Sequence, residues 1–503
     1  MNPDIAEIPA GNDAISAKHT ERQSSGWDIS NAPKNYIYLI LFQIASAAFS
    51  FGAVWLITRR VGSEGYGAIV AVIAASQVAQ VFVNWTSISV VRFGVDEFVE
   101  TARIARTFWM RFVILFVNLT LVLSLAVIWF PPLADWLKLS PGAFWLVVIH
   151  FAVTAFWLHV QMSLQGAKML RWQGFLQMCE RLLIFAVVLA LFASNHLEFY
   201  WTVLCYIAAP AVMVVAGLVG LREFIFARFS FDVTFFKKIL LYSVPLLPFT
   251  LVGYFSGSYV DAMFISKFLS TSDLGVYSIA TQVNGIAMQI PTLANTILLP
   301  LLVTLRAESG DQRSFNYFRN VLPGITLLWG LACVLLSFIG YLLVPVIFGP
   351  KFAGAALPIW ILLTASVVSM PVAIGYSALA NSMSTTYVPM IAGVVSAAVN
   401  ISANFILIPK YGMAGCAWAT LIAYFAASST LALLLKKTAK MPVSWTLIAI
   451  APSIAGTIII CWWQNPPFGL AVCIAASFLV GFLFRESLNK SVLFIRNLRT
   501  ARV

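Results

Sequence analysis

Charge is scarce in this chain. Of its 503 residues, only 10% are Asp, Glu, Lys or Arg, whereas 61% are hydrophobic, and the mean hydropathy is +0.90. A soluble protein of this size needs much more charge to cover its surface, so the composition excludes one. Apolar runs of about 20 residues, the length that crosses a hydrocarbon core, recur from Tyr36 almost to the C-terminus. The chain is therefore predicted to be an all-α polytopic membrane protein.

Motifs of the common enzyme classes are missing as well. The sequence contains no Walker-type phosphate-binding loop, no HExxH zinc motif and no long loop that could carry paired catalytic carboxylates. Its six cysteines all fall within apolar runs and show no metal-ligand spacing, which is typical of small packing residues. We therefore expect no enzymatic activity, no metal site and no cofactor.

The distribution of basic residues predicts the topology. About fourteen spans of roughly 20 residues can be placed, and the polar residues 1–34, which do not resemble a signal peptide, are expected to form a disordered cytoplasmic tail. With that tail inside, 24 of the 31 Lys and Arg residues fall on the cytoplasmic side, and only Arg181 falls within a span. This bias follows the positive-inside rule and places both termini in the cytoplasm. The net charge of +12 therefore indicates no nucleic-acid partner.

The two halves of the chain share short polar turns. "GSEGYG" after the first span aligns with "STSDLG" after the seventh when Gly67 is matched with Gly275, an offset of 208. "SLQGAKMLRWQG" similarly matches "SALANSMSTTYV" at an offset of 214. Because each half has six spans, an even number, the repeats would have the same orientation and enclose a site at their interface. Chance similarity between hydrophobic segments is the alternative.

The predicted organisation follows from this repeat. It comprises a tail (residues 1–34), an N-terminal lobe of helices one to six (35–225), a C-terminal lobe of helices seven to twelve (226–440), and two additional helices with a basic cytoplasmic tail (441–503).

Four segments resemble motifs of a known family. "RRVGSEGYGAIVAV" resembles the turn after the first helix in the polysaccharide transporters of the MOP flippase superfamily, and "VDAMFISKFLSTSDLGVYSIATQV" resembles the corresponding turn of their second lobe. "VIFGPKFAGAALPIWIL" is similar to their connection between helices nine and ten, and "LIPKYGMAGCAWATLIAYF" to the turn between helices eleven and twelve. The segments occur in family order between Tyr36 and Phe425. The polar tail and the two additional spans depart from the pattern and leave the subfamily open.

The resemblance implies two six-helix lobes around a central cavity. It also implies export of an oligosaccharide linked to undecaprenyl pyrophosphate across the bacterial inner membrane by alternating access, as in Wzx-type O-antigen and exopolysaccharide flippases. The implied partners are this lipid-linked substrate, the lipid bilayer and other polysaccharide assembly proteins. Alternatives are a peptidoglycan-precursor flippase and a cation-coupled multidrug exporter, although the latter should have more buried carboxylates. A membrane polysaccharide polymerase or glycosyltransferase would need a large outer loop, which the sequence lacks.

Two predicted spans carry polar stripes at helical spacing, and the offset of 208 matches Asn84 with Thr292. Amides and hydroxyls suit sugars because both groups donate and accept hydrogen bonds. We interpret the stripes as cavity lining, with hydrogen bonding between helices as the alternative. Gln43, Tyr254 and Trp157 are further candidates for the lining, Trp157 because its ring can stack on a sugar. The stripes comprise Gln77, Gln80 and Asn84 in span two, and Gln282, Gln289 and Thr292 in span eight.

Four cations are candidates for binding pyrophosphate. Arg181 is the first, because a planar guanidinium binds phosphate oxygens as a fork and no predicted loop contains this residue. Arg111 is the second. Arg59 and Lys267, at equivalent outer ends of the first helix in each half, could hold the phosphate after the lobes move. Snorkelling of these side chains to the membrane interface is the alternative.

One carboxylate stands out in the second half. Asp261 lies about a turn from the outer end of span seven, near Lys267. An ionisable group at this depth indicates either a site for a coupling proton or sodium ion, or an ion pair with a cation at the interface. Asp261 is therefore the candidate for the coupling ion.

Overall fold

The computed structural model describes residues 32–137, 139–226, 231–247, 258–309, 311–382, 387–439, 441–442, 444–463 and 465–500. Within these ranges the regular structure is entirely helical, and no strand is formed. Ten helical stretches are long and apolar enough to cross a membrane. The prediction of an all-α polytopic membrane protein is confirmed.

The described residues of the first half form eight helices. They are α2 (Ala32–Ala79), α3 (Val81–Asn84), α4 (Ser87–Thr101), α5 (Ala105–Ile128), α6 (Phe130–Leu137), α7 (Pro141–Gly166), α8 (Leu170–Ala193) and α9 (Phe199–Ile225).

The second half begins with α10 (Val233–Ser243), the short η2 (Val244–Leu246), α12 (Ser258–Phe268), α13 (Thr271–Ser309), α14 (Asp311–Asn320) and α15 (Leu322–Phe348). It continues with η3 (Pro350–Ala355), α16 (Ala356–Pro371), the π-helical turn η4 (Val372–Tyr376), α17 (Ser377–Ser382) and α18 (Tyr387–Ala439). The last three helices are α19 (Ser444–Trp463), α20 (Pro466–Leu483) and α21 (Arg485–Thr500).

Two glycines divide the longest helices into pairs of spans. Within α2, Gly62 has a φ of 68°, and within α18, Gly412 has a φ of 58°. This left-handed region is readily adopted only by glycine, so the helix breaks sharply at each of these residues. The predicted turn after the first span is thus much tighter than the polar segment "GSEGYG" suggested.

Two predicted spans are not continuous helices. Span two is interrupted after Ala79 and again at Trp85 and Thr86, before α4 begins at Ser87. Span seven, expected over 239–265, is α10 followed by η2, and its chain is described again only from Ser258. The predicted candidate Tyr254 lies outside the described residues.

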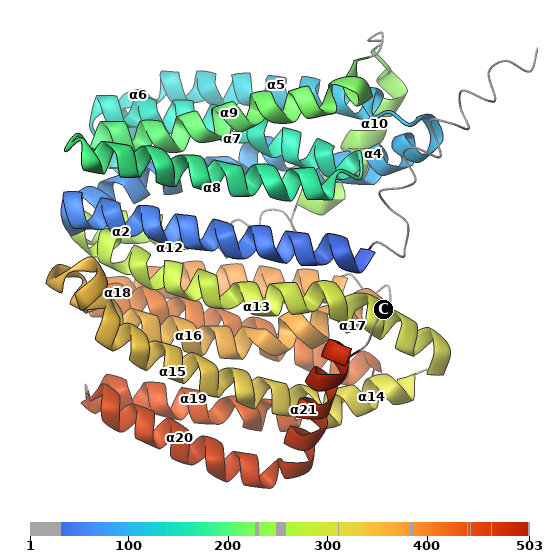
Figure 1. Ribbon diagram of the computed structural model, residues 1–503, viewed down its shortest axis with the longest axis vertical. Helices are drawn as coiled ribbons and strands as arrows, with labels where there is room; N and C mark the ends of the chain where they lie inside the picture. The colour runs from blue at the N-terminus through green and yellow to red at the C-terminus, as the bar shows by residue number, and fades with distance from the viewer. Residues whose placement is uncertain are drawn as a thin grey trace, which may run out of the picture.

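The long helices run side by side, with α5, α7, α8 and α9 on one side of the molecule and α15, α16, α19 and α20 on the other (Figure 1). Between them lie α2 and α13, which pack against each other, while α2 also packs against α8. We call the two ends of the bundle the Gly62 end, at the left of Figure 1, and the Thr101 end, at the right. A buried apolar cluster that includes Ile57, Ile69, Ile279 and Ile361 joins the two sides.

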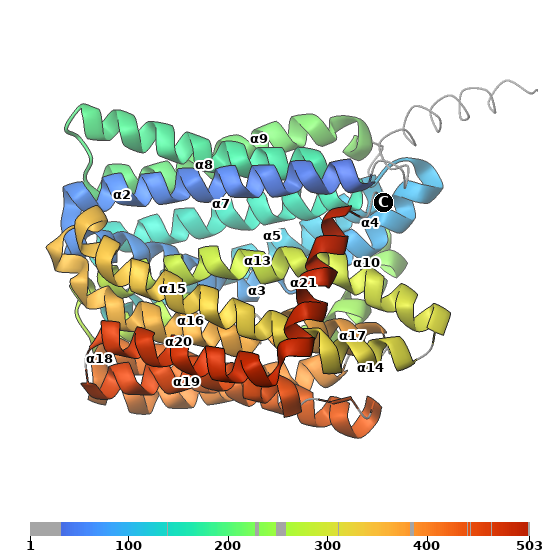
Figure 2. The same cartoon turned by 60° about the horizontal axis from the view of Figure 1, so that its bottom comes forward.

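The C-terminal helices cover one flank of the second half. Thr457 of α19 and Thr364 of α16 share a hydrogen bond of 2.6 Å between their hydroxyls. After α20, the chain turns, and α21 crosses the bundle steeply near the Thr101 end (Figure 2). Ser491 of α21 donates to the carbonyl of Val321 at 2.9 Å, so this helix is fixed to the start of α15.

Candidate functional site

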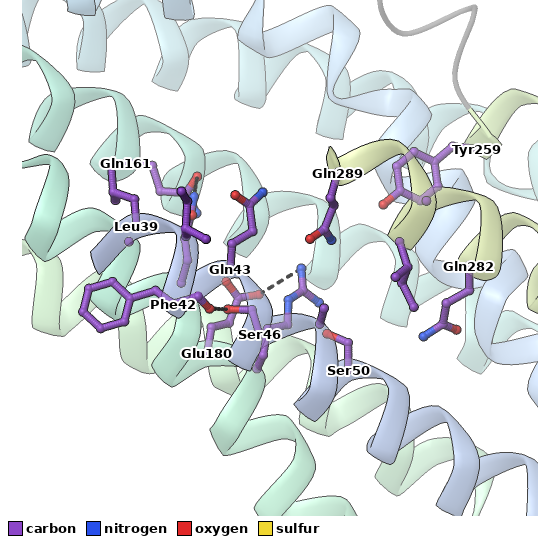
Figure 3. A pocket seen from close by; sticks show the side chains of 17 residues that line it. Leu39, Phe42, Gln43, Ser46, Ser50, Gln161, Glu180, Tyr259, Gln282 and Gln289 are labelled. Carbon is purple, nitrogen blue, oxygen red and sulfur yellow. Dashed lines mark hydrogen bonds and ion pairs between the residues drawn. The ribbon is translucent and has the colours of Figure 1, made fainter. Parts of the chain in front are cut away.

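A cavity of about 770 Å³ lies between the two sides of the bundle. Its walls come from α2, α7 and α8 on one side and from α12 and α13 on the other (Figure 3). The lining residues from α2 all belong to the first nineteen residues of that helix, and those from α8 begin at Gly174. The cavity therefore occupies the half of the bundle nearer the Thr101 end. The size is ample for part of a large polar headgroup.

Five glutamines line this cavity. Three of them, Gln43, Gln161 and Gln177, belong to the first half of the chain, and the Gln177 side chain donates to the side-chain oxygen Oε1 of Gln161 at 3.3 Å. The other two, Gln282 and Gln289, lie on the face of α13 that borders the cavity. Amides on both walls can donate to and accept from a ligand with many hydroxyls. The predicted stripe of span eight therefore reaches the cavity through its two glutamines.

Arg181 is the cation of this cavity. It comes from the middle of α8, lines the cavity, and has a side chain that is 43% exposed. Its neighbour Glu180 lies 4.0 Å from it, between the carboxylate and guanidinium atoms, which is the limit of an ion pair. Because Glu180 also accepts a hydrogen bond of 2.7 Å from the Trp157 indole, that carboxylate is held on the cavity wall. Arg181 keeps donors available for an anion.

Trp157 is not part of the cavity lining. Its side chain is 4% exposed and packs in an apolar cluster with Leu176 and Met213, so its ring cannot stack on a ligand. Its contact with the cavity is indirect, through the hydrogen bond to Glu180. The prediction that Trp157 lines the cavity is wrong for this structure, because the helix face that carries it is turned toward α8 and α9.

The stripe of span two faces the protein interior rather than the cavity. Gln80 and Asn84 are 2% and 1% exposed. Gln80 donates to the Phe151 carbonyl at 2.9 Å, and Asn84 accepts from Arg111 at 2.7 Å. The interruption of span two at Gln80 turns these side chains toward α5 and α7, so the alternative of hydrogen bonding between helices describes them correctly.

Arg111 belongs to the same buried network. Its side chain is fully buried, and it contacts Asn84 on α3 rather than the cavity. The proposal of a phosphate ligand does not fit this position. Arg111 instead links α5 to the interrupted part of span two.

The remaining predicted candidates lie away from the cavity. Gln77 is half-buried and Thr292 is exposed, with its hydroxyl bonded to the Met288 carbonyl at 2.9 Å. Neither lines the cavity. Lys267 is exposed near the end of α12, at the Gly62 end of the bundle, so the structure does not bring it to Arg181.

The Gly62 end is closed by contacts between the two halves. The hydroxyls of Ser63 and Ser272 lie 2.7 Å apart, and Gly67 packs directly against Thr271. Arg59 donates through Nε to the Ile347 carbonyl at 2.8 Å and also bonds the Val346 carbonyl, at the C-terminal end of α15. Cations are favourable at that end of a helix. Arg59 thus joins the two halves, instead of facing an anion.

Asp261 is buried among neutral groups of the second half. Its carboxylate accepts hydrogen bonds from Thr420 at 2.8 Å, Asn404 at 3.0 Å and Tyr277 at 3.3 Å. Asn404 also donates to Asn400 at 3.1 Å. The hydrogen-bond partners of Asp261 are neutral, so the alternative of an ion pair at the interface does not describe this structure.

Sequence reasoning missed several cavity residues. Gly174 and Gln177 precede Arg181 by seven and four residues along the same helix, and this spacing could have revealed them. Tyr259 was missed because it does not belong to the polar residues of span seven that share one helical face, Thr250, Tyr254, Ser258 and Asp261. Its place on the cavity wall depends on how α12 packs against α2.

The fold, with its long apolar helices and the cavity between two helical halves, defines a polytopic membrane protein. The structure matches that of the "Lipid II flippase MurJ, inward closed conformation" with a TM-score of 0.65 over 91% of this chain and 99% of that one, at 17% identity. It also matches an inward-facing multidrug resistance MATE family transporter of the MOP superfamily with a TM-score of 0.56, at 12% identity over 82% of this chain and 98% of that one. At these identities the likeness shows the fold.

Sequence comparison then gives the family. The family model described as "Polysaccharide biosynthesis protein" matches residues 32–306, more than half of the chain, and the chain belongs to this family. The "Probable flippase AglR" of Haloferax volcanii is 25% identical over 213 residues, 39% of this chain and 43% of that protein. The "Uncharacterized membrane protein MJ1068" of Methanocaldococcus jannaschii is 23% identical over 250 residues, 48% of each chain. The matches thus span less than half the length of these curated relatives.

Proposed function

We propose that this protein is a flippase that moves an oligosaccharide linked to polyprenyl pyrophosphate across the bacterial inner membrane, for the export of a polysaccharide. The cargo presents two chemical groups to a transporter: a diphosphate and a set of sugar hydroxyls. The cavity offers a partner for each, since Arg181 can bind phosphate oxygens as a fork and the glutamine amides can bind hydroxyls. The apolar Leu39, Ile40 and Phe42 at one side of the same cavity suit the start of the lipid.

The observation that carries this proposal is the position of Arg181. Its guanidinium lies in the middle of α8, its side chain is 43% exposed, and it lines the cavity between the halves. A cation within a membrane span costs free energy, so such residues are rare and mark functional sites. Sugars alone would not need it, whereas a diphosphate does.

The charge distribution supports an orientation. Basic residues gather at the Thr101 end, so we place that end in the cytoplasm together with both termini. The cavity then faces the leaflet where the lipid-linked substrate is made. The closed Gly62 end would open when the halves rock about the cavity, as in alternating access.

Replacement of Arg181 tests the proposal. We expect Arg181→Ala to reduce polymer at the cell surface at least tenfold and to cause the lipid-linked intermediate to accumulate. Arg181→Lys should retain part of the export, because the lysine ammonium keeps the positive charge but cannot bind two phosphate oxygens at once as the planar guanidinium does. Arg171→Ala is the matched control, since Arg171 is an exposed cation at the start of the same helix, over the ring of Tyr38. Normal export by Arg181→Ala at equal protein level would refute the proposal.

We further propose that Asp261 binds the coupling ion. A carboxylate surrounded by hydroxyl and amide groups, with no Lys or Arg among its hydrogen-bond partners in the described residues, suits a proton or a sodium ion. Its partners lie on α13 and α18, two helices of the second half, so a bound cation would change how α12 packs against both. The change can thereby reach the contact between α13 and α2.

A further inference from the structure

A second, smaller cavity lies deeper in the bundle, toward the Gly62 end. Its volume is about 260 Å³, and it shares Ser50, Arg181, Tyr259 and Gln282 with the larger cavity. Arg181 and Tyr259 therefore stand at the boundary between the two cavities. A volume of 260 Å³ corresponds to about nine waters of liquid, which is room for one sugar ring but not for an oligosaccharide.

Tyrosines form much of the wall of this deeper cavity. Tyr66 comes from α2, Tyr206 from α9, Tyr259 from α12 and Tyr277 from α13. Within the described part of the chain, the hydroxyls of Tyr66, Tyr206 and Tyr259 form no hydrogen bond, although Tyr66 is only 6% exposed. Tyrosine combines an apolar ring face with a hydroxyl that both donates and accepts, which are the two groups that a pyranose ring needs.

The other lining residues are of the same chemical kind. Ser278 and Thr281 on α13 add hydroxyls, and Gln282 adds an amide. Arg181 is the only charged residue among the lining residues that the structure describes, and it stands at the boundary. The deeper cavity is therefore neutral, aromatic and rich in hydroxyls, whereas the charge lies at its entrance.

We propose that the deeper cavity is a monosaccharide subsite, which receives the sugar attached directly to the pyrophosphate. The inference rests on the proposed function, because it takes Arg181 as the pyrophosphate ligand. A diphosphate at Arg181 has the lipid on one side and the first sugar on the other. The apolar Leu39, Ile40 and Phe42 belong to the larger cavity, so the lipid leaves through that side and the sugar points toward the tyrosines. The remaining sugars stay in the larger cavity, whose volume is about three times greater.

The position of this subsite also determines which part of the substrate reaches the other side first. Tyr66 directly precedes Gly67, and Tyr277 follows Gly275 by two residues, so the subsite adjoins the contact that closes the Gly62 end. When that contact separates, the sugar is the first part of the substrate to be exposed on the other side. The identity of this first sugar would then determine which substrates are transported.

Binding of short synthetic lipids tests the subsite. The probes are farnesyl pyrophosphate and the same lipid carrying one glucose, one N-acetylglucosamine or one 6-deoxyhexose, titrated into the purified full-length protein by calorimetry. At least one probe with a sugar should bind about fivefold or more tightly than farnesyl pyrophosphate. Tyr66→Phe, which removes one hydroxyl, should reduce this advantage by about two- to tenfold.

A variant whose new side chain fills the deeper cavity provides the decisive test. Thr281 lines only the deeper of the two cavities, so Thr281→Phe should abolish the advantage of the sugar and leave farnesyl pyrophosphate binding unchanged. Thr292→Phe is the matched control, because Thr292 is exposed on the same helix and lines neither cavity. The proposal is overturned if no sugar increases affinity, or if the advantage survives Thr281→Phe. Binding of farnesyl pyrophosphate that does not depend on Arg181 would instead refute the proposed function.

Discussion

Gly67 and Gly275 pack against each other's helices in a reciprocal contact. A Cβ atom on Gly67 would lie 1.8 Å from the Thr271 carbonyl oxygen, and one on Gly275 would lie 2.0 Å from the Ser63 carbonyl oxygen. Thr271 follows Ser63 by 208 residues, which is also the offset between the two glycines. A reciprocal contact of this kind is what a two-fold relation produces, because residue i then meets j while the copy of i meets the copy of j. The contact therefore supports the alignment of the two halves at this offset.

Substitution of either glycine should weaken this contact. Gly67→Ala or Gly275→Ala places a methyl group where backbone lies, and neither helix can yield without a shift of the other. We expect each to lower the free energy of unfolding by about 1–3 kcal/mol, the usual cost of overpacking, measured by thermal unfolding in detergent. Gly285→Ala is the control for stability, since no atom lies within 4 Å of its added Cβ. Equal stability of all three variants would show that the halves do not meet at this contact.

Accessibility should separate the cavity glutamines from the buried stripe. In a variant without the six native cysteines, Gln43→Cys and Gln289→Cys should react with a membrane-impermeant thiol reagent, because both line the cavity. Asn84→Cys should stay unreacted, since Asn84 is 1% exposed. Reagent added to inside-out vesicles should label the first two faster than reagent added to right-side-out vesicles. Equal labelling of all three positions would contradict the assignment of the cavity.

The buried network of α3 and α5 should contribute to stability. Asn84→Ala removes the oxygen that Arg111 contacts at 2.7 Å and leaves a buried donor without that acceptor. We expect a loss of about 1–3 kcal/mol in the free energy of unfolding. Thr120→Ala on the same helix as Arg111 should be nearly neutral, because Thr120 is exposed and bonds only the Phe116 carbonyl. If Asn84→Ala leaves the free energy of unfolding unchanged, the network does not contribute to stability.

Neutralisation of Asp261 should remove the response to the coupling ion. Asp261→Asn keeps the shape of the side chain and its hydrogen-bonding capacity toward Thr420, but it cannot bind a proton or a sodium ion as a carboxylate does. Sodium or low pH should shift the thermal unfolding of the native protein and not that of the variant. Cation-driven transport in proteoliposomes should fall at least tenfold.

Glu64→Gln is the matched control for Asp261→Asn, since Glu64 is an exposed carboxylate at the Gly62 end. It should respond to the cation as the native protein does. If Asp261→Asn keeps the full response, another group binds the ion or transport is not coupled.

The class of the protein was readable from the amino-acid sequence. Hydrocarbon imposes a helix on every segment that crosses it, because backbone groups must bond within the segment, so composition and run length were sufficient. The polar turn that begins at Gly62 could be recognised because a sharp helix break needs a residue that readily adopts a positive φ. Arg181 could be singled out because it is the one Lys or Arg that no predicted loop or tail contains.

Only the tertiary structure decided which polar faces meet the cavity. The stripes of span two and span eight look alike in the sequence, yet Gln80 and Asn84 bond α5 and α7 while Gln282 and Gln289 face the cavity. Helical spacing places residues on one face, but the rotation of that helix against its neighbours is set by packing and by the interruption of span two. The deeper cavity is decided in the same way, because its tyrosines come from four helices of both halves of the chain. Their convergence depends on the closed contact between Gly67 and Gly275, which no single segment encodes.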